Sequence, residues 1–145
     1  AIFASPQGLA LSSDGSRLLV ADYAMGIVAV DIAARKATLL APPPDTALLA
    51  IDELTSDGET VIAVQQLTPS RVLKVALSPG WDRIERVEVL AANSPLHDEP
   101  TLGQISEGAF YYVANSQWPR FGDDGSVKGD APFTDAVVAR LPLPR

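Results

Sequence analysis

The chain has 145 residues, enough for one domain, and it carries a net charge of −7 with a pI near 4.5. Nucleic-acid binding needs a concentrated basic surface, which scattered Lys and Arg residues in an acidic chain do not provide. The absence of cysteine excludes disulfides, thiolate zinc sites and cysteine nucleophiles. No apolar run approaches the roughly 20 residues of a membrane-spanning helix. The composition therefore predicts a soluble protein and does not choose between cytoplasm and periplasm.

One pattern of strand, tight turn and strand occurs three times along the chain, in residues 5–22, 51–64 and 99–115. Each copy has a Ser-acidic-Gly turn, at 13–15, 56–58 and 106–108, followed by a strand of β-branched or aromatic residues. Glycine suits such hairpin turns because it accepts a positive φ at little cost. The turns recur 43 and 50 residues apart, a period typical of four-stranded propeller blades.

The residues between the copies predict the remaining strands of each unit. Residues 26–31 and 71–77 are predicted as third strands, 36–40 and 83–90 as outer fourth strands, and 136–141 as the last third strand. The sequence thus predicts an all-β protein, a β-propeller of about three four-stranded antiparallel blades at 5–41, 48–91 and 98–143. Residues 1–4 are predicted as the outer strand of a preceding or partner blade. A β-sandwich also shows closely spaced strands, but one turn signature in three matched units favours the propeller.

The first copy resembles the blade signature of a family of six-bladed propellers. This is the superfamily of the senescence marker protein, gluconolactonase and luciferin-regenerating enzyme. The resemblance lies in SPQGLALSSDG at 5–15 and LVAD at 19–22. It runs along most of the chain in register with the blades, and it implies the C-terminal half of such a propeller.

The resemblance also implies a divalent cation, usually calcium, held in the central channel by oxygen ligands where the innermost strands begin. The family's Asn position is occupied here by Gln7, a departure, whereas Asp52 matches an Asp position and is predicted as a metal ligand. Glu53 follows it, and Glu99 stands at the corresponding entry of the third copy, so both are predicted as catalytic carboxylates. The Glu of the family's first blade has no counterpart here. The alternative is that these carboxylates only cap turns or face solvent.

Further polar and aromatic residues are predicted to line the rim of the channel. Gln7 at a strand entry, and Asp22 and Asn115 at the ends of second strands, are predicted to bind ligand, although Asx residues favour such turns in any case. Trp118 lies in a long insertion that runs to residue 135. It forms, with Phe121 and Phe133, either an aromatic lid over the channel or a fastening of the insertion to the blade edge.

The only histidine, His97, stands near Ser94 and Asp98, but close sequence neighbours rarely make a working triad and the nucleophile-elbow glycines are missing. It is therefore predicted to be a loop histidine.

The function that this pattern favours is a gluconolactonase-like propeller that binds or hydrolyses a small polar ligand of the lactone or ester class in its central channel. As an enzyme it would be a metal-dependent lactonase or esterase, because a cation polarises a carbonyl and activates a bound water. The alternative is a non-catalytic propeller scaffold that binds protein or carbohydrate. Three blades do not close a ring, so the end blades are expected to meet either N-terminal blades absent from this chain or a second copy of it.

Overall fold

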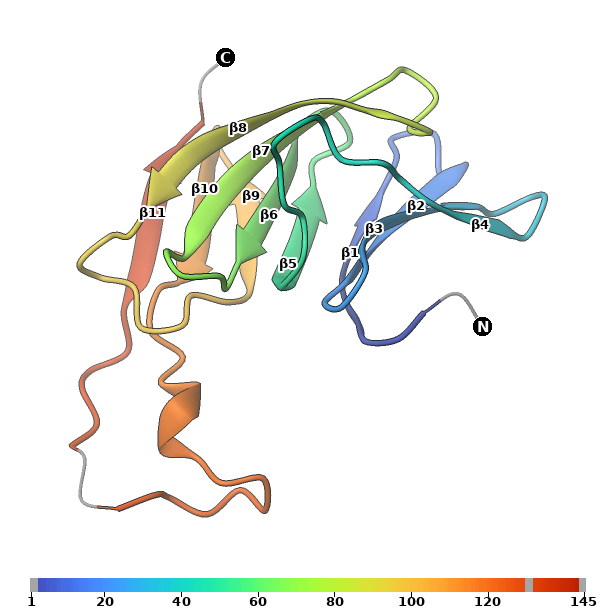
Figure 1. Ribbon diagram of the computed structural model, residues 1–145. Helices are drawn as coiled ribbons and strands as arrows, with labels where there is room; N and C mark the ends of the chain where they lie inside the picture. Colours follow the sequence, from blue (N-terminus) through green and yellow to red (C-terminus); the bar gives the residue numbers. More distant parts are fainter. Residues whose placement is uncertain (1–2, 130–131, 144–145) are drawn as a thin grey trace.

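Three antiparallel sheets make up the computed structural model, which describes residues 3–129 and 132–143 (Figure 1). The first sheet contains β1 (Pro6–Leu11), β2 (Arg17–Asp22), β3 (Gly26–Asp31) and β4 (Lys36–Leu39). The second contains β5 (Ile51–Ser56), β6 (Val61–Gln65), β7 (Arg71–Leu77) and β8 (Ile84–Ala92). The third contains β9 (Gly103–Ser106), β10 (Ala109–Val113) and β11 (Val138–Pro142). The predicted all-β class with antiparallel four-stranded sheets is confirmed.

The hairpin turns that define the repeat form as expected. Gly15, Gly58 and Gly108 have φ values of 69°, 98° and 70°, which the tight turns require. The predicted third strands 26–31 and 71–77 coincide with β3 and β7, and the outer strands agree within two residues. No helix in the part of the chain that the structure describes is long and apolar enough to cross a membrane.

Residues 1–2, part of the predicted outer strand 1–4, lie outside the described residues. Phe3 and Ala4 are not in a strand, and the backbone N–H of Ala4 donates to the carboxylate of Asp22 at 2.6 Å.

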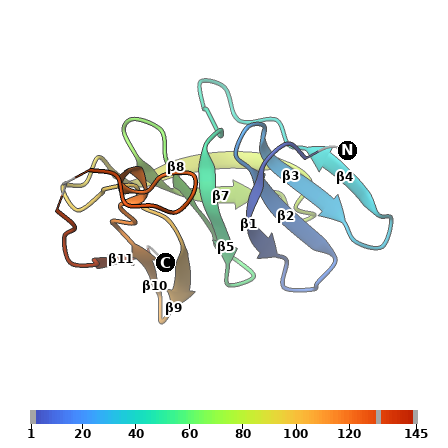
Figure 2. The ribbon, with the colours of Figure 1, turned by 90° about the horizontal axis from the view of Figure 1, so that it is seen from below.

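The sheets are arranged as a fan in which the first strand of each blade lies innermost. Figure 2 shows β1 and β5 side by side near the middle, with the first blade on one side and the third on the other. Buried apolar side chains between adjacent blades form two cores. One joins blades one and two, with Leu19, Ile27, Leu54, Ala63, Leu73 and Trp81, and the other joins blades two and three, with Ile62, Val64, Val72, Ile105 and Phe110.

The innermost strands β1 and β5 approach most closely at Gly8. A Cβ atom placed on Gly8 would lie 2.1 Å from the backbone nitrogen of Leu54 and 2.7 Å from the carbonyl carbon of Glu53. Because both neighbours are backbone atoms, no side-chain rotation relieves the overlap. Glycine at this position therefore sets the distance between the first two blades.

Blades two and three are also joined through His97, which bridges two hydroxyl groups. Its Nδ1 lies 2.8 Å from Ser70 Oγ in the loop before β7, and its Nε2 lies 2.9 Å from Tyr112 OH on β10. The imidazole also meets the Tyr112 ring edge to face, with 5.7 Å between ring centres. The predicted loop histidine is thus a contact between blades.

Replacement of Gly8 by Ala is expected to force β1 and β5 apart and to lower the free energy of unfolding by about 1–3 kcal/mol, as overpacking does. Urea denaturation of Gly8→Ala would measure this loss. Gly80→Ala is the matched control, because a Cβ there meets nothing closer than 3.7 Å. Equal stability of the two variants would contradict the close approach.

The contribution of His97 to stability is expected to fall as the pH falls from 7.5 to 5.5. Burial lowers the pKa of His97 below its usual 6.5, so below pH 6.5 the unfolded chain binds more protons at this residue than the folded chain does. The free energy of unfolding, measured by urea denaturation across this range, should decline less steeply in His97→Gln than in the wild type. Identical slopes in the two proteins would contradict this role.

Candidate functional site

Equivalent backbone hydrogen bonds mark the point where the chain enters each innermost strand. In all three blades an N–H just beyond the second strand donates to a carbonyl just before the first strand: Tyr23 to Ser5 at 2.8 Å, Gln66 to Ala50 at 2.8 Å, and Ser116 to Glu99 at 3.3 Å. Ala50 and Glu99 both have a positive φ, of 55° and 56°, which agrees with this equivalence. The residues two positions beyond the acceptors are Gln7, Asp52 and Thr101.

These three side chains line one cavity at the entry ends of the innermost strands, with a volume of about 590 Å³. Its other lining residues are Pro6, Gly8, Leu102, Ser116, Trp118 and Phe121. A volume of this size falls within the roughly 300–1,000 Å³ of small-molecule pockets. Two residues predicted from the sequence, Gln7 and Asp52, therefore meet in one place, together with the predicted Trp118.

Thr101 is the residue of this set that sequence reasoning missed. Its hydroxyl donates a short hydrogen bond to Oδ2 of Asp52, from an adjacent blade. Glu99 was predicted to correspond to Asp52, but the backbone register places it level with Ala50, two residues earlier. The sequence could have indicated Thr101 only by counting residues from the start of the innermost strand. Pro100 makes that start hard to locate, because it interrupts the alternation of apolar and polar residues that marks a strand.

Glu53 is directed to backbone rather than into this cavity. Its Oε1 accepts a hydrogen bond from the N–H of Leu54 at 3.0 Å, and the N–H of Gly103 on β9 also donates to it. Burial raises the pKa of Glu53 above its usual value, while these N–H groups oppose the rise and nearby Asp52 adds to it. Glu53 thus links the innermost strands of blades two and three, and it is not among the cavity-lining residues.

Glu99 borders a second hollow of about 600 Å³, on the other side of Trp118 and Phe121. Burial raises the pKa of Glu99, and the negative charges of Asp98 and then Asp52 raise it further. Glu99 therefore holds a proton more readily than an ordinary glutamate. The two hollows share the aromatic pair as a common wall.

Asp22 and Asn115, predicted to bind ligand, are buried and hold backbone instead. The carboxylate of Asp22 accepts from the N–H groups of Ala4 and Ser5 at the entry to β1, and of Ala24 and Met25 in the next turn. Burial favours the neutral form of Asp22, but these four N–H groups prevail and lower its pKa.

Gln65 occupies the same place in blade two and was not predicted. It is fully buried, and its Nε2 donates to the carbonyls of Ala47 and Leu49 at 2.9 and 2.7 Å, ahead of β5. Its Oε1 accepts from Arg71 Nε at 2.9 Å. Each blade therefore ends its second strand with a buried polar side chain that fixes a neighbouring connection.

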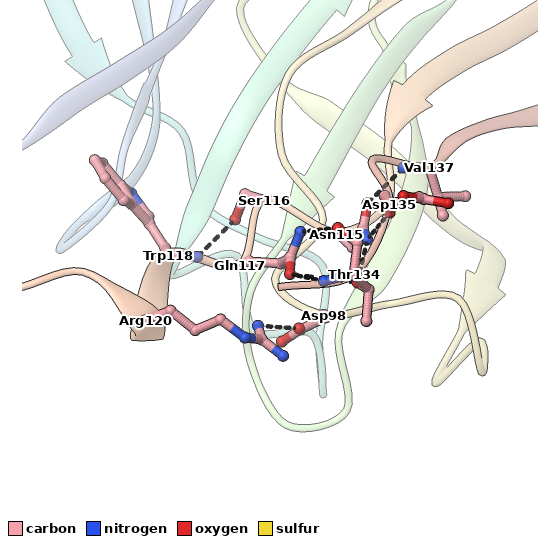
Figure 3. A network of polar contacts seen from close by, with 9 residues as sticks. All are labelled: Asp98, Asn115, Ser116, Gln117, Trp118, Arg120, Thr134, Asp135 and Val137. Carbon is pink, nitrogen blue, oxygen red and sulfur yellow. Dashed lines mark hydrogen bonds and ion pairs between the residues drawn. The ribbon is translucent and has the colours of Figure 1, made fainter. Parts of the chain in front are cut away.

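The long insertion is held at its base by Asn115 and Gln117 (Figure 3). Asn115 accepts from the N–H of Val137 at 2.6 Å and donates to the carbonyl of Asp135 at 2.8 Å. Gln117 accepts from the N–H of Thr134 at 2.9 Å and donates to its carbonyl at 3.0 Å. These bonds join the outgoing and returning arms of the insertion beside the cavity.

Beyond this base, the insertion forms a short 3₁₀ turn (Trp118–Arg120) that carries the aromatic side chains. Figure 3 shows Trp118 pointing away from the Asn115 and Gln117 cluster, while Arg120 reaches Asp98 with 2.6 Å between Nη1 and Oδ2. Phe121 contacts Trp118 at 5.9 Å and Phe133 at 5.4 Å between ring centres. The three aromatic side chains thus contact one another, and Trp118, 65% exposed, lines the cavity together with Phe121. Whether they act as a lid or as a fastening stays a prediction.

The residues present do not by themselves fit a calcium site. Calcium takes six to eight oxygen ligands, yet no group of three or more His, Cys, Asp or Glu side chains able to hold a metal occurs in residues 3–129 and 132–143. Asp52 is the one carboxylate that lines the first cavity. The other side-chain oxygens at this cavity belong to the neutral residues Gln7, Thr101 and Ser116, so no chemical step is assigned to a cation.

No family model matches the chain, and a search of the curated proteins finds no match to it. Two solved structures resemble it in fold. One is a soluble aldose sugar dehydrogenase from Escherichia coli in its apo form, with a TM-score of 0.61 and 14% identity. The other is a luciferin-regenerating enzyme, with a TM-score of 0.62 and 16% identity.

Both likenesses cover 97% of this chain but only 44% and 45% of those chains, so this chain spans less than half their length. At such identity they bear on the fold alone, where they agree with a partial propeller.

Loss of the Gln117 side chain is expected to release the insertion from its base. Gln117→Ala removes the bonds to Thr134 from a largely buried position, which should lower stability by about 1–3 kcal/mol. Hydrogen exchange of residues 116–137 should quicken while that of β5 and β6 stays unchanged. Gln104→Ala, on exposed β9 surface, is the control, and equally slow exchange in both variants would contradict the role of Gln117.

Proposed function

We propose that the cavity formed by Gln7, Asp52 and Thr101 binds a small polar ligand of the sugar or lactone class. The observation that supports this most strongly is the convergence of equivalent positions from three blades on one cavity. The polar groups suit the hydroxyl and carbonyl oxygens of such a ligand. Trp118 and Phe121 offer aromatic surface to the apolar faces of its ring.

Hydrolysis of a lactone or ester is the finer part of the proposal. Glu99 borders the second hollow and not the first cavity, so it would act on a ligand that extends past Trp118 and Phe121. With its raised pKa it would donate a proton to the leaving alkoxide of such a ligand, since a group that titrates nearer neutrality transfers protons more effectively. Asp52 would accept a proton from the water that attacks the carbonyl carbon. The ring C–O bond then breaks and the hydroxy acid is released. At the end of the reaction Glu99 has lost a proton and Asp52 has gained one.

The alternative, a non-catalytic binding scaffold, is favoured by one observation. Glu53 is held by backbone N–H groups, which leaves Asp52 as the only carboxylate of the described residues on the first cavity wall. An aldonolactone and the corresponding aldose separate these possibilities. The aldose can only be bound, whereas the lactone can also be opened, with acid release that an indicator dye reports.

Asp52→Asn is expected to weaken aldose binding about 10-fold to 100-fold, the effect of losing a hydrogen bond to a charged group. Trp118→Ala should weaken it as well, because the ring loses its stacking surface. Isothermal titration calorimetry would measure both variants. The controls are Glu88→Gln on exposed β8 and Val127→Ala, which line neither cavity.

The outcomes distinguish each part of the proposal. Unchanged affinity in Asp52→Asn and Trp118→Ala would overturn the binding site. If the wild type bound the aldose but did not open the lactone, the result would support the non-catalytic scaffold and reject hydrolysis. A rise in Tm on addition of about 1 mM calcium, absent in Asp52→Asn, would support the predicted cation, and no rise would reject it for this chain.

A further inference from the structure

The first blade has an apolar face that no described segment covers completely. Along β1 the side chain of Ala10 enters the core toward blade two, so by alternation Leu9 and Leu11 lie on the opposite face. They are 56% and 50% exposed. The cross-strand register continues this face from Leu9 through Val20 and Val28, which are buried at 6% and 0% exposure, to Leu39, which is 43% exposed. The open part of the face therefore consists of Leu9, Leu11 and Leu39.

The third blade presents a second open face at the other end of the fan. Ala139 packs toward blade two, so its neighbour Val138 lies on the outer face, where it is 66% exposed. This sheet has three strands in the order β11-β10-β9, so β11 is paired along one edge among the described residues. Unpaired edges and exposed apolar faces favour association with another sheet.

The accessible surface of the chain is large for its mass. A compact monomer of 15.3 kDa is expected to expose about 7,100 Å², whereas this chain exposes 8312 Å². The difference of roughly 1,200 Å² exceeds the about 800 Å² that each partner buries in a standard interface. Figure 1 shows the insertion projecting from the fan, so part of this extra surface belongs to it and the rest is available to the end faces. The chain therefore has enough spare surface for a stable contact.

We propose that a second copy of this chain covers these faces, the first blade of each copy packing against the third blade of the other. A two-fold axis makes this contact twice and closes a ring of six sheets. In length, two copies would correspond to 88–90% of either of two structures of the same fold, since one copy matches 44–45% of them. The edge of β11 then lies at the junction between the copies.

Sedimentation velocity at about 50 µM protein tests the dimer. The expected mass is twice 15.3 kDa. Leu9→Asp and Val138→Asp each place a charge on one end face and should give monomers, with circular dichroism confirming that each variant is folded. Val127→Asp, 54% exposed in the insertion, is the control and should remain a dimer.

Mixing the two monomeric variants distinguishes this arrangement from others. The Leu9→Asp copy keeps its third-blade face and the Val138→Asp copy keeps its first-blade face, so one of the two contacts is intact and partial dimer should return. A dimer of two first blades would be broken by Leu9→Asp alone. If the Val138→Asp variant remained a dimer while Leu9→Asp became a monomer, the proposal would be overturned. Monomeric wild type would also overturn it and would leave the end faces to further blades of a longer polypeptide.

Discussion

The arrangement of the site depends on buried polar side chains at the ends of the second strands. Asp22 binds the N–H groups that lead into β1, and Gln65 binds the carbonyls that lead into β5. In each case the residue type matches the backbone group that must be satisfied: a carboxylate accepts, and an amide NH₂ donates. An unsatisfied buried group costs about 1–3 kcal/mol, so these connections are fixed in place. The entry positions that follow, Gln7 and Asp52, are therefore fixed as well.

In the third blade the buried polar side chain is Asn115, and it holds the long insertion instead of the entry to an innermost strand. Its amide both accepts and donates, and it holds the returning arm of the insertion at Asp135 and Val137. The third blade thereby acquires a projecting segment that the other two lack (Figure 1). Trp118 and Phe121 reach the cavity because this segment is held at its base. A structural polar residue in one blade thus positions the aromatic wall of the site.

The strands and turns were predictable from the sequence because their signals are local. The Ser-acidic-Gly turns and the alternation in β3 and β7 need only neighbouring residues to be recognised. The partners of Gln65 lie 16 and 18 residues upstream, and no local pattern predicts them. Thr101 was missed for a related reason: its role depends on a bond to Asp52, 49 residues away. Asp22 and Asn115 were placed at the correct strand ends, yet whether they face ligand or backbone is decided by packing.

The cavity lies close to the open face of the first blade, through Gln7. Gln7 belongs to the first blade, whose outer face carries Leu9 and Leu11, and the Gln7 side chain is itself exposed. A sheet packed on that face would lie beside the entry to β1 and would extend the rim from which Gln7 projects. The exposed side chains Leu9 and Leu11 belong to the same strand as Gln7, so a sheet that covered them would border the cavity that the three entry positions form.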